Sequence, residues 1–365
     1  MSMMEVRKKT RTSGIELLRI LAMIMIVAHH FATHVQWEQI SSINHYWITI
    51  LGSFGRIGVG IFFIITGYFL ARQKDYNWRK IFNTIRPTWF YSLMFLAIFL
   101  ILGDNKITFS FPLNAYVEKS VFPILSNAYW FISSYVIVSL LSPYIKKGLD
   151  ALENRELIKI LIILFICGFC AKLFNLSIAN STALIMEIPV GIFYVIVGYT
   201  IYRYREDINS IAWSIVGILL SLAMIAFAPV IIHFGLAFGY NIPSDLFTEV
   251  YAPATIIFSI CVFIVFSRLN FSSKVINYIA SLTFGIYLIH ENLFVGYTLW
   301  NTNNIFSITS HANDGLFSLI LYSLAVVMIV FIACGLIEAA RKVSVRVISY
   351  ICNIEQRNKI KEEAK

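Results

Sequence analysis

The sequence predicts an all-α fold, a polytopic integral membrane bundle of about ten transmembrane helices with both termini in the cytoplasm. Of the 365 residues, 58% are hydrophobic and 13% are charged, whereas soluble chains average roughly 45–50% and about 25%. The 30 Phe, 19 Tyr and 7 Trp suit helices that cross hydrocarbon and are anchored by aromatic rings at its two interfaces. One membrane-embedded domain is therefore expected to occupy residues 1–365, with no fused extracellular domain.

Apolar segments of sufficient length recur along the chain. A helix needs about twenty mostly apolar residues to cross a hydrocarbon core of about 30 Å. The first segment follows a basic tail and imitates a signal peptide, but His29, His30 and Phe31 stand where cleavage requires small residues, so it is expected to remain. The predicted spans cover residues 14–34, 55–71, 88–103, 128–145, 157–174, 184–202, 211–235, 250–267, 277–299 and 315–338.

Basic residues mark the loops between these spans and give the orientation. They concentrate in the tail 1–13, in "RQKDYNWRKIFNTIRP", "KKGLDALENRELIK" and "RYRED", in the stretch 268–274, and in the tail 340–365. Cytoplasmic loops carry an excess of Lys and Arg, so these segments, and both termini, are predicted to be cytoplasmic. The same distribution explains the net charge of +9 and argues against nucleic acid as a partner, because no single basic face is formed.

Ionisable residues interrupt the otherwise apolar first span, which contains Glu16, Arg19, His29, His30 and His34. A charged side chain at the centre of a span costs roughly 2.5–3.5 kcal/mol on insertion scales, so such residues are functional candidates. Arg19 and His30 are three helical turns apart, which is about 1100° of rotation and ~16 Å along the axis. They are therefore predicted to face one cavity, with Arg19 towards the cytoplasm and His30 in the outer half.

The chemistry of this pair suits acyl transfer. An imidazole can take the proton of a hydroxyl as general base, and a guanidinium can hold a phosphate or carboxylate bidentately. His29 points about 100° away from His30 and is assigned a structural role, whereas His34 is placed at the outer mouth of the same cavity. The alternative is that Arg19 snorkels to the inner headgroups and that the histidines are interfacial.

Five segments, in order along about 275 residues, resemble membrane acyltransferase family three. In "ELLRILAMIMIVAHHF" the family's Arg and His fall on Arg19 and His30. The second segment, "GVGIFFIITGYFL", has Thr66 where the family usually has Ser. The remaining three segments are "RKIFNTIRPTWFYS", "AYWFISSYVIVSLLSPYI" and "SLTFGIYLIHENLF".

The resemblance implies an enzyme of the bacterial cytoplasmic membrane. It implies that His30 is the catalytic histidine, that Arg19 is its partner, and that acyl-CoA arrives from the cytoplasm, with no metal. The expected activity is O-acyl transfer, in first place O-acetyl transfer from acetyl-CoA, to a hydroxyl of a cell-surface or lipid-linked glycan. Arg79, Lys80 and Arg86 are candidates for the CoA phosphates, and Arg86 precedes Pro87 at an expected helix entrance; the positive-inside rule also accounts for these charges.

Further ionisable residues are placed in the outer half. Arg56 is expected to open the second span, and Glu187 to lie early in the sixth. Tyr287, His290 and Glu291 are expected about halfway along the ninth. Either glutamate can orient His30 or the sugar, or neutralise Arg56. The aromatic run 129–131 suits sugar stacking or, more commonly, an interfacial belt.

A transporter is the alternative function. Arg19, His30, Glu187 and Glu291 would then form a proton or substrate pathway for a glycan or small solute. The sequence shows no inverted repeat of the kind common in transporters, and its buried charges gather on the first span. Membrane lipids are expected partners under either hypothesis.

Overall fold

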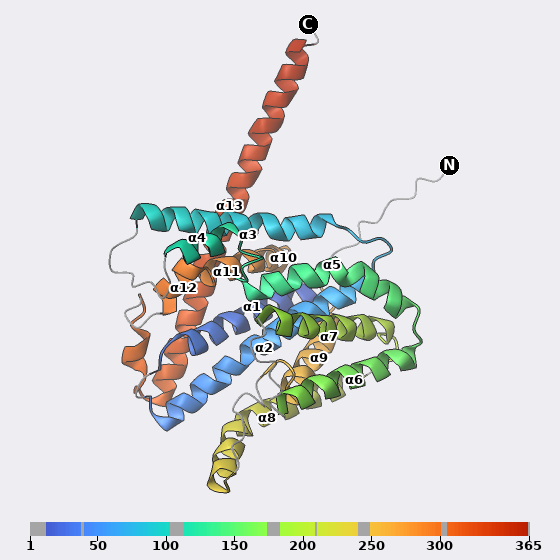
Figure 1. The fold of residues 1–365 in the computed structure, drawn as a ribbon, viewed down its shortest axis with the longest axis vertical. Helices are drawn as coiled ribbons and strands as arrows, with labels where there is room; N and C mark the ends of the chain where they lie inside the picture. Colours follow the sequence, from blue (N-terminus) through green and yellow to red (C-terminus); the bar gives the residue numbers. More distant parts are fainter. Residues whose placement is uncertain are drawn as a thin grey trace.

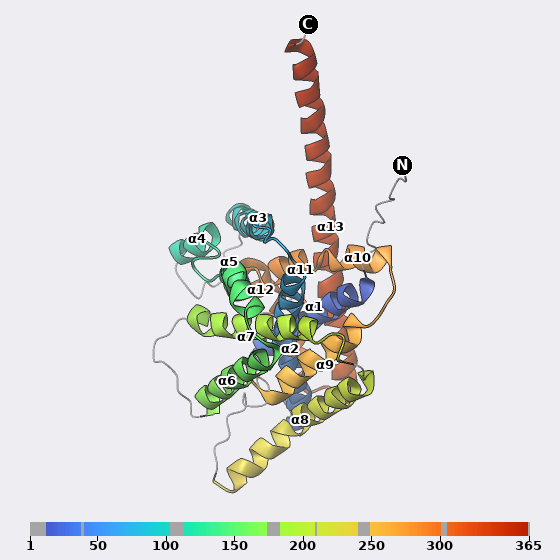
Figure 2. The same ribbon diagram turned by 90° about the vertical axis from the view of Figure 1, so that its right-hand side faces the viewer.

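The computed structural model describes residues 12–37, 40–102, 113–173, 183–208, 210–239, 249–300 and 305–363, and these contain helices without any strand. Figures 1 and 2 show a bundle from which one long helix, α13, projects. The helices are α1 (Ser13–His34), α2 (Ser42–Ala71), α3 (Arg79–Leu102), α4 (Leu113–Val121), α5 (Trp130–Asp150), α6 (Asn154–Leu173), α7 (Ala183–Arg203), α8 (Ile211–Ala237), α9 (Pro253–Ser267), α10 (Lys274–Ala280), α11 (Thr283–His290), α12 (Leu293–Trp300) and α13 (Leu316–Glu363).

Several helices have the length and composition of membrane spans. Five qualify among the described residues, and six do if Lys274–His290 and Leu293–Trp300, bent by 81°, form one span. Each of the predicted segments contains a helix or a broken helix. The expectation of an all-helical chain with several helices long and apolar enough to cross a membrane is therefore confirmed for the described residues, while ten spans and cytoplasmic termini stay predictions.

Helices α1 and α2 form the centre of the bundle. In each, 67% of the most apolar window is buried, against 22% in α3 and 17% in α8. Helix α2 also packs against α7 and α9, and α11 packs against α1 and α13 (Figure 2). A helix that is apolar all round belongs in a core or in lipid, so the exposed apolar sides of α3 and α8 suit contact with acyl chains.

Glycines permit the closest approach between α2 and α7. A methyl group on Gly67 would lie 1.9 Å from the carbonyl oxygen of Val195, and one on Gly198 would lie 2.0 Å from that of Ile64. Small residues at such crossings let helix backbones pack tightly within a membrane. Gly67 and Gly198 therefore allow α2 and α7 to pack with their backbones in close contact.

Gly67→Ala is expected to destabilise the protein by about 1–3 kcal/mol, the usual effect of overpacking. The added methyl group has to displace the backbone of α7, which cannot yield as a flexible side chain would. Thermal unfolding of detergent-solubilised protein measures the effect. Gly148→Ala is the matched control, because a methyl group there meets no atom within 4 Å; equal loss in both variants would contradict the packing account.

Two helices begin earlier than the sequence predicts. Helix α2 starts at Ser42, because Ile48, Ile50 and Leu51 continue its apolar pattern, so Arg56 lies near its middle and does not open it. Helix α3 starts at Arg79 and contains Pro87 in its interior. The expectation that Arg86 stands at a helix entrance is therefore wrong.

The last two predicted spans also differ. The ninth is broken into α10, α11 and α12, because Asn292 ends one helix and caps the next: its Oδ1 accepts a hydrogen bond from the backbone N–H of Phe294 at 3.1 Å. The tenth continues as one helix to Glu363, because the residues after Arg341 include no Gly or Pro to stop it.

Candidate active site

His30 lies at the centre of a buried polar cluster. Its Nδ1 is 3.0 Å from Nε2 of His290 and 3.0 Å from Oε2 of Glu291. The same carboxylate oxygen is 3.2 Å from Nε2 of His34, and the His34 ring stacks on His30 with centroids 4.6 Å apart. His30 is 4% exposed and His290 is 0% exposed. The structure thus joins α1 to the end of α11 through residues 260 apart in the chain.

The hydrogen bonds determine which nitrogen of neutral His30 carries the proton. His290 donates from Nδ1 to the carbonyl oxygen of Ile286 at 2.6 Å, so its Nε2 is an acceptor. His30 must then donate from Nδ1, which lies between this acceptor and the carboxylate of Glu291. Its Nε2 consequently keeps a lone pair. A histidine held in this tautomer by a carboxylate is arranged as a general base.

Asn292 and Tyr129 fix the loop that carries the cluster. The Asn292 amide donates to the Tyr129 hydroxyl at 2.8 Å, and this hydroxyl donates to the Leu288 carbonyl oxygen at 3.3 Å. Tyr129 is 1% exposed, so it is part of the core and not of an interfacial belt or a sugar-stacking surface. The break after α11 is therefore held from both sides by satisfied buried hydrogen bonds.

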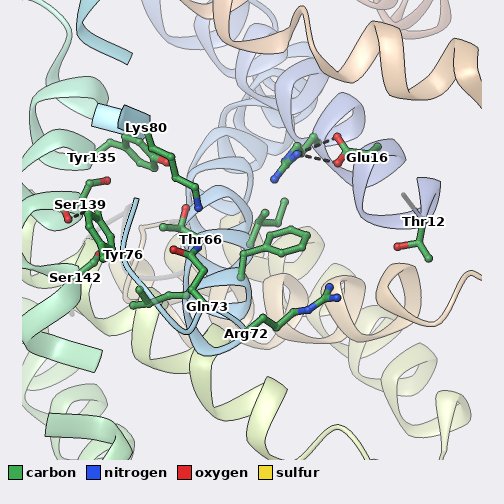
Figure 3. Close-up of a pocket in the computed structure, with 14 residues that line it drawn as sticks. Thr12, Glu16, Thr66, Arg72, Gln73, Tyr76, Lys80, Tyr135, Ser139 and Ser142 are labelled. Atoms are coloured by element: carbon green, nitrogen blue, oxygen red, sulfur yellow. Dashed lines mark hydrogen bonds and ion pairs between the residues drawn. The ribbon is translucent and has the colours of Figure 1, made fainter. Parts of the chain in front are cut away.

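A large cavity lies at the opposite end of α1. Its volume is about 800 Å³, and its cationic lining groups are Arg19, Arg72 and Lys80. Arg19 is held by Glu16, whose two carboxylate oxygens are each 2.9 Å from Nη1, as the dashed lines in Figure 3 show. Polar side chains complete the walls: Thr12, Thr66, Gln73, Tyr76, Tyr135, Ser139 and Ser142.

An inner cavity extends this space towards the histidines. Its volume is about 320 Å³, and it shares Arg19, Ile65, Thr66 and Tyr135 with the large cavity. Its wall includes Tyr287, whose ring is 5.9 Å from the ring of His290, centroid to centroid. The two cavities therefore adjoin at Arg19 and together extend from the α2–α3 loop to Tyr287, while His30, His290 and Glu291 line neither of them.

The other predicted site residues are distributed unevenly around this path. Lys80 lines the large cavity, whereas Arg79 and Arg86 are exposed and are not among the residues lining either cavity. Arg56 lies 3.4 Å from Glu249 and over the ring of Trp130. The side chain of Glu187 lies outside the described residues.

The His30 cluster also has the composition of a cation site. His30, His34 and Glu291 offer one ligand atom each, and these atoms lie within 4.8 Å of one another. Two histidines and a carboxylate are a ligand set that zinc uses in catalytic sites. The sequence prediction of a metal-free site therefore needs a direct test.

Sequence reasoning missed three contributors. Asn292 is two residues beyond His290, and an amide that follows an ionisable pair within an apolar segment is a signal for a helix break. Glu249 directly precedes a predicted span and was not considered as a partner of Arg56. Arg72 was treated as one basic loop residue among several. In the structure, Arg72 and Lys80 are the cations of the described part of this loop that line the large cavity.

Comparison with known proteins identifies the family of this chain. Searches of curated proteins and of solved structures give no match. A family model described as an acyltransferase domain matches residues 12–338, which include both cavities and the His30 cluster. The chain therefore belongs to membrane acyltransferase family three.

Proposed function

We propose that the protein is an O-acyltransferase, and specifically an O-acetyltransferase, that moves the acetyl group of acetyl-CoA to a hydroxyl of a cell-surface or lipid-linked glycan. One observation carries the proposal: two adjoining cavities extend from cationic loop residues to Tyr287, whose ring lies 5.9 Å from the ring of His290 in the cluster where Glu291 orients His30. The cations suit the phosphates of a CoA carrier, and the oriented imidazole suits activation of a hydroxyl.

The proposed reaction uses His30 in both of its steps. Nε2 takes the proton of the acceptor hydroxyl as its oxygen attacks the thioester carbonyl carbon. Glu291 stabilises the imidazolium that results. When the tetrahedral intermediate collapses, the C–S bond breaks, and the CoA thiolate receives the proton from His30. An ester and free CoA thiol are the products.

A transporter would use the same residues differently, as a relay for protons or solute. Membranes containing the protein, supplied with radiolabelled acetyl-CoA and their own glycan, discriminate between these functions. Transfer of label that depends on His30 supports the acyltransferase. Movement of unlabelled glycan across the membrane, with no label transferred, supports the exporter.

The large cavity, as the proposed binding site of acetyl-CoA, gives a prediction about the loop cations that line it. Replacing both Arg72 and Lys80 with Ala is expected to raise KM for acetyl-CoA about 100-fold or more and to change kcat little, because charge-assisted hydrogen bonds to the donor are worth about 1.5–3 kcal/mol each. The matched control removes Arg79 and Arg86 from the same loop region. Steady-state kinetics measure both, and equal effects in the two double variants would contradict the assignment of the cavity.

A further inference from the structure

The hydroxyl of Tyr287 is buried without a hydrogen-bond partner among the described residues. The residue is 2% exposed. The backbone amide of Phe131, in the first turn of α5, approaches the hydroxyl without completing a hydrogen bond. Buried polar groups in native proteins are nearly always paired, and an exception requires an explanation.

Other buried tyrosines of this protein have satisfied hydroxyls. Tyr194 is 0% exposed and donates to the carbonyl oxygen of Val250 at 2.8 Å, and Tyr91 is 0% exposed and donates to Glu338 at 2.6 Å. Tyr129, whose ring is 6.3 Å from that of Tyr287, is also satisfied. The unused donor is thus specific to Tyr287 within this group.

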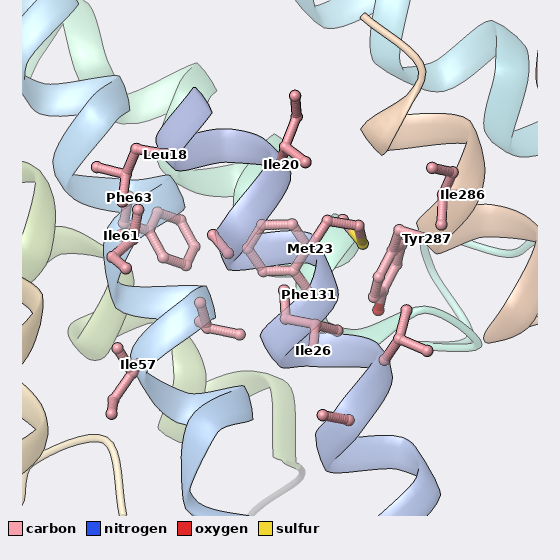
Figure 4. Close-up of a cluster of buried hydrophobic side chains, with 14 of the residues drawn as sticks. Leu18, Ile20, Met23, Ile26, Ile57, Ile61, Phe63, Phe131, Ile286 and Tyr287 are labelled. Carbon is pink, nitrogen blue, oxygen red and sulfur yellow. The ribbon is translucent and has the colours of Figure 1, made fainter. Parts of the chain in front are cut away.

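Tyr287 adjoins both the inner cavity and the ring of His290. Tyr287 lines the inner cavity and precedes His290 by one helical turn on α11. Figure 4 shows its ring beside Met23, with the hydroxyl oxygen directed towards the level of Ile26 on α1. Ile26 and His30 are four residues apart, so they lie on the same face of α1. Tyr287 and Met23 line the same cavity, so the Tyr287 ring lies beside the face of α1 that also carries His30, seven residues after Met23.

We propose that Tyr287 is a further catalytic residue, whose hydroxyl donates a hydrogen bond to the thioester carbonyl oxygen of the acyl donor. The inference rests on the proposed acyl transfer and adds a role to it. As the acceptor oxygen attacks the carbonyl carbon, the π electrons of the C=O bond move to its oxygen, and Tyr287 stabilises that negative charge without losing its own proton. The electrons return when the C–S bond breaks.

This role explains why the fold tolerates an unpaired hydroxyl. A donor that is pre-oriented and free of other partners needs no reorganisation when charge develops on the substrate. Met23 and Phe131, which line the same cavity and are 1% and 5% exposed, give the hydroxyl apolar neighbours, and a hydrogen bond to a charge is stronger in an apolar environment than in water.

Tyr287→Phe tests the proposal by two measurements on the full-length protein. Removing one oxyanion donor typically lowers kcat by about 10²–10³-fold, so we expect a loss in kcat of about 100-fold or more, with KM for acetyl-CoA within about twofold. The unfolding temperature should stay equal or rise, because no native hydrogen bond is lost. Tyr194→Phe, as control, should lower the unfolding temperature and leave kcat unchanged.

The outcomes separate this inference from the proposed function. If His30→Ala is inactive while Tyr287→Phe keeps the wild-type kcat, the role of Tyr287 is overturned and the proposed function stands. If Tyr287→Phe lowers the unfolding temperature as much as Tyr194→Phe and raises KM in place of lowering kcat, the residue is structural. If His30→Ala transfers acetyl groups as the wild type does, both proposals fail.

Discussion

Replacing His30 with alanine is expected to lower acetyl transfer by about 10³-fold, within the range that a general base contributes. The reason is geometric: the hydrogen bonds of His290 and Glu291 leave the lone pair of His30 on Nε2, and removing the ring leaves no base at that point. The initial rate of label transfer from radiolabelled acetyl-CoA into the glycan fraction measures the loss. Binding of acetyl-CoA should persist, because its proposed cationic contacts lie at the other end of α1.

His45→Ala is the matched control for this variant. His45 is exposed near the start of α2 and is not one of the cluster residues, so its removal should leave the rate within about twofold of wild type, as expected for a surface substitution. Folding of both variants is checked by their unfolding temperatures. A folded His30→Ala protein that transfers label at the wild-type rate would show that His30 is not the base.

Glu291→Gln is expected to lower kcat by about 10²–10³-fold. The amide keeps the shape of the side chain, but it removes the charge that stabilises the imidazolium and offers an N–H that can turn His30 into the wrong tautomer. The corresponding Asp→Asn change in serine proteases costs about 10⁴-fold. A smaller loss is expected here because His290 still accepts from Nδ1 of His30.

Chelation provides the second arm of the Glu291 experiment. If His30, His34 and Glu291 act without a metal, prolonged dialysis against EDTA should leave the wild-type rate unchanged. Loss of activity that zinc restores would instead assign these residues to a cation. If Glu291→Gln keeps full activity, both after dialysis against EDTA and after addition of zinc, the orienting role of the Glu291 carboxylate is contradicted.

Helical periodicity was sufficient to predict the face of α1, whereas Glu291 was only one of two glutamates that could orient His30, and the structure places it there. The three-turn spacing placed Arg19 and His30 on one side, and the structure puts Arg19 on the cavity path and His30 in the polar cluster beyond it. The hydrogen-bonding partners of His30 on α11, His290 and Glu291, come 260 and 261 positions later, and no local pattern specifies such a pairing. The break at Asn292 that presents Glu291 depends on a hydrogen bond to Tyr129, again a tertiary contact.

The distribution of charge predicted the basic loop, but it did not predict which of the loop's cations line the cavity. The positive-inside rule assigns a loop rich in Lys and Arg to the cytoplasmic side as a whole, so it does not distinguish Arg72, Lys80 and Arg86. Side-chain direction depends on where α3 begins, and the start at Arg79 turns Arg86 away from the cavity. The start of α2 was likewise misplaced. Arg56 was expected to begin the second span, whereas α2 begins at Ser42, fourteen residues earlier.

The most direct test of the central claim uses purified protein in sealed lipid vesicles that contain lipid-linked glycan from the source membrane. Radiolabelled acetyl-CoA is added, and label is measured in the glycan as an ester released by mild base. The account predicts ester-linked label with wild-type protein and none above background with His30→Ala. Glycan that crosses the vesicle membrane without acquiring label would contradict the account and establish transport instead.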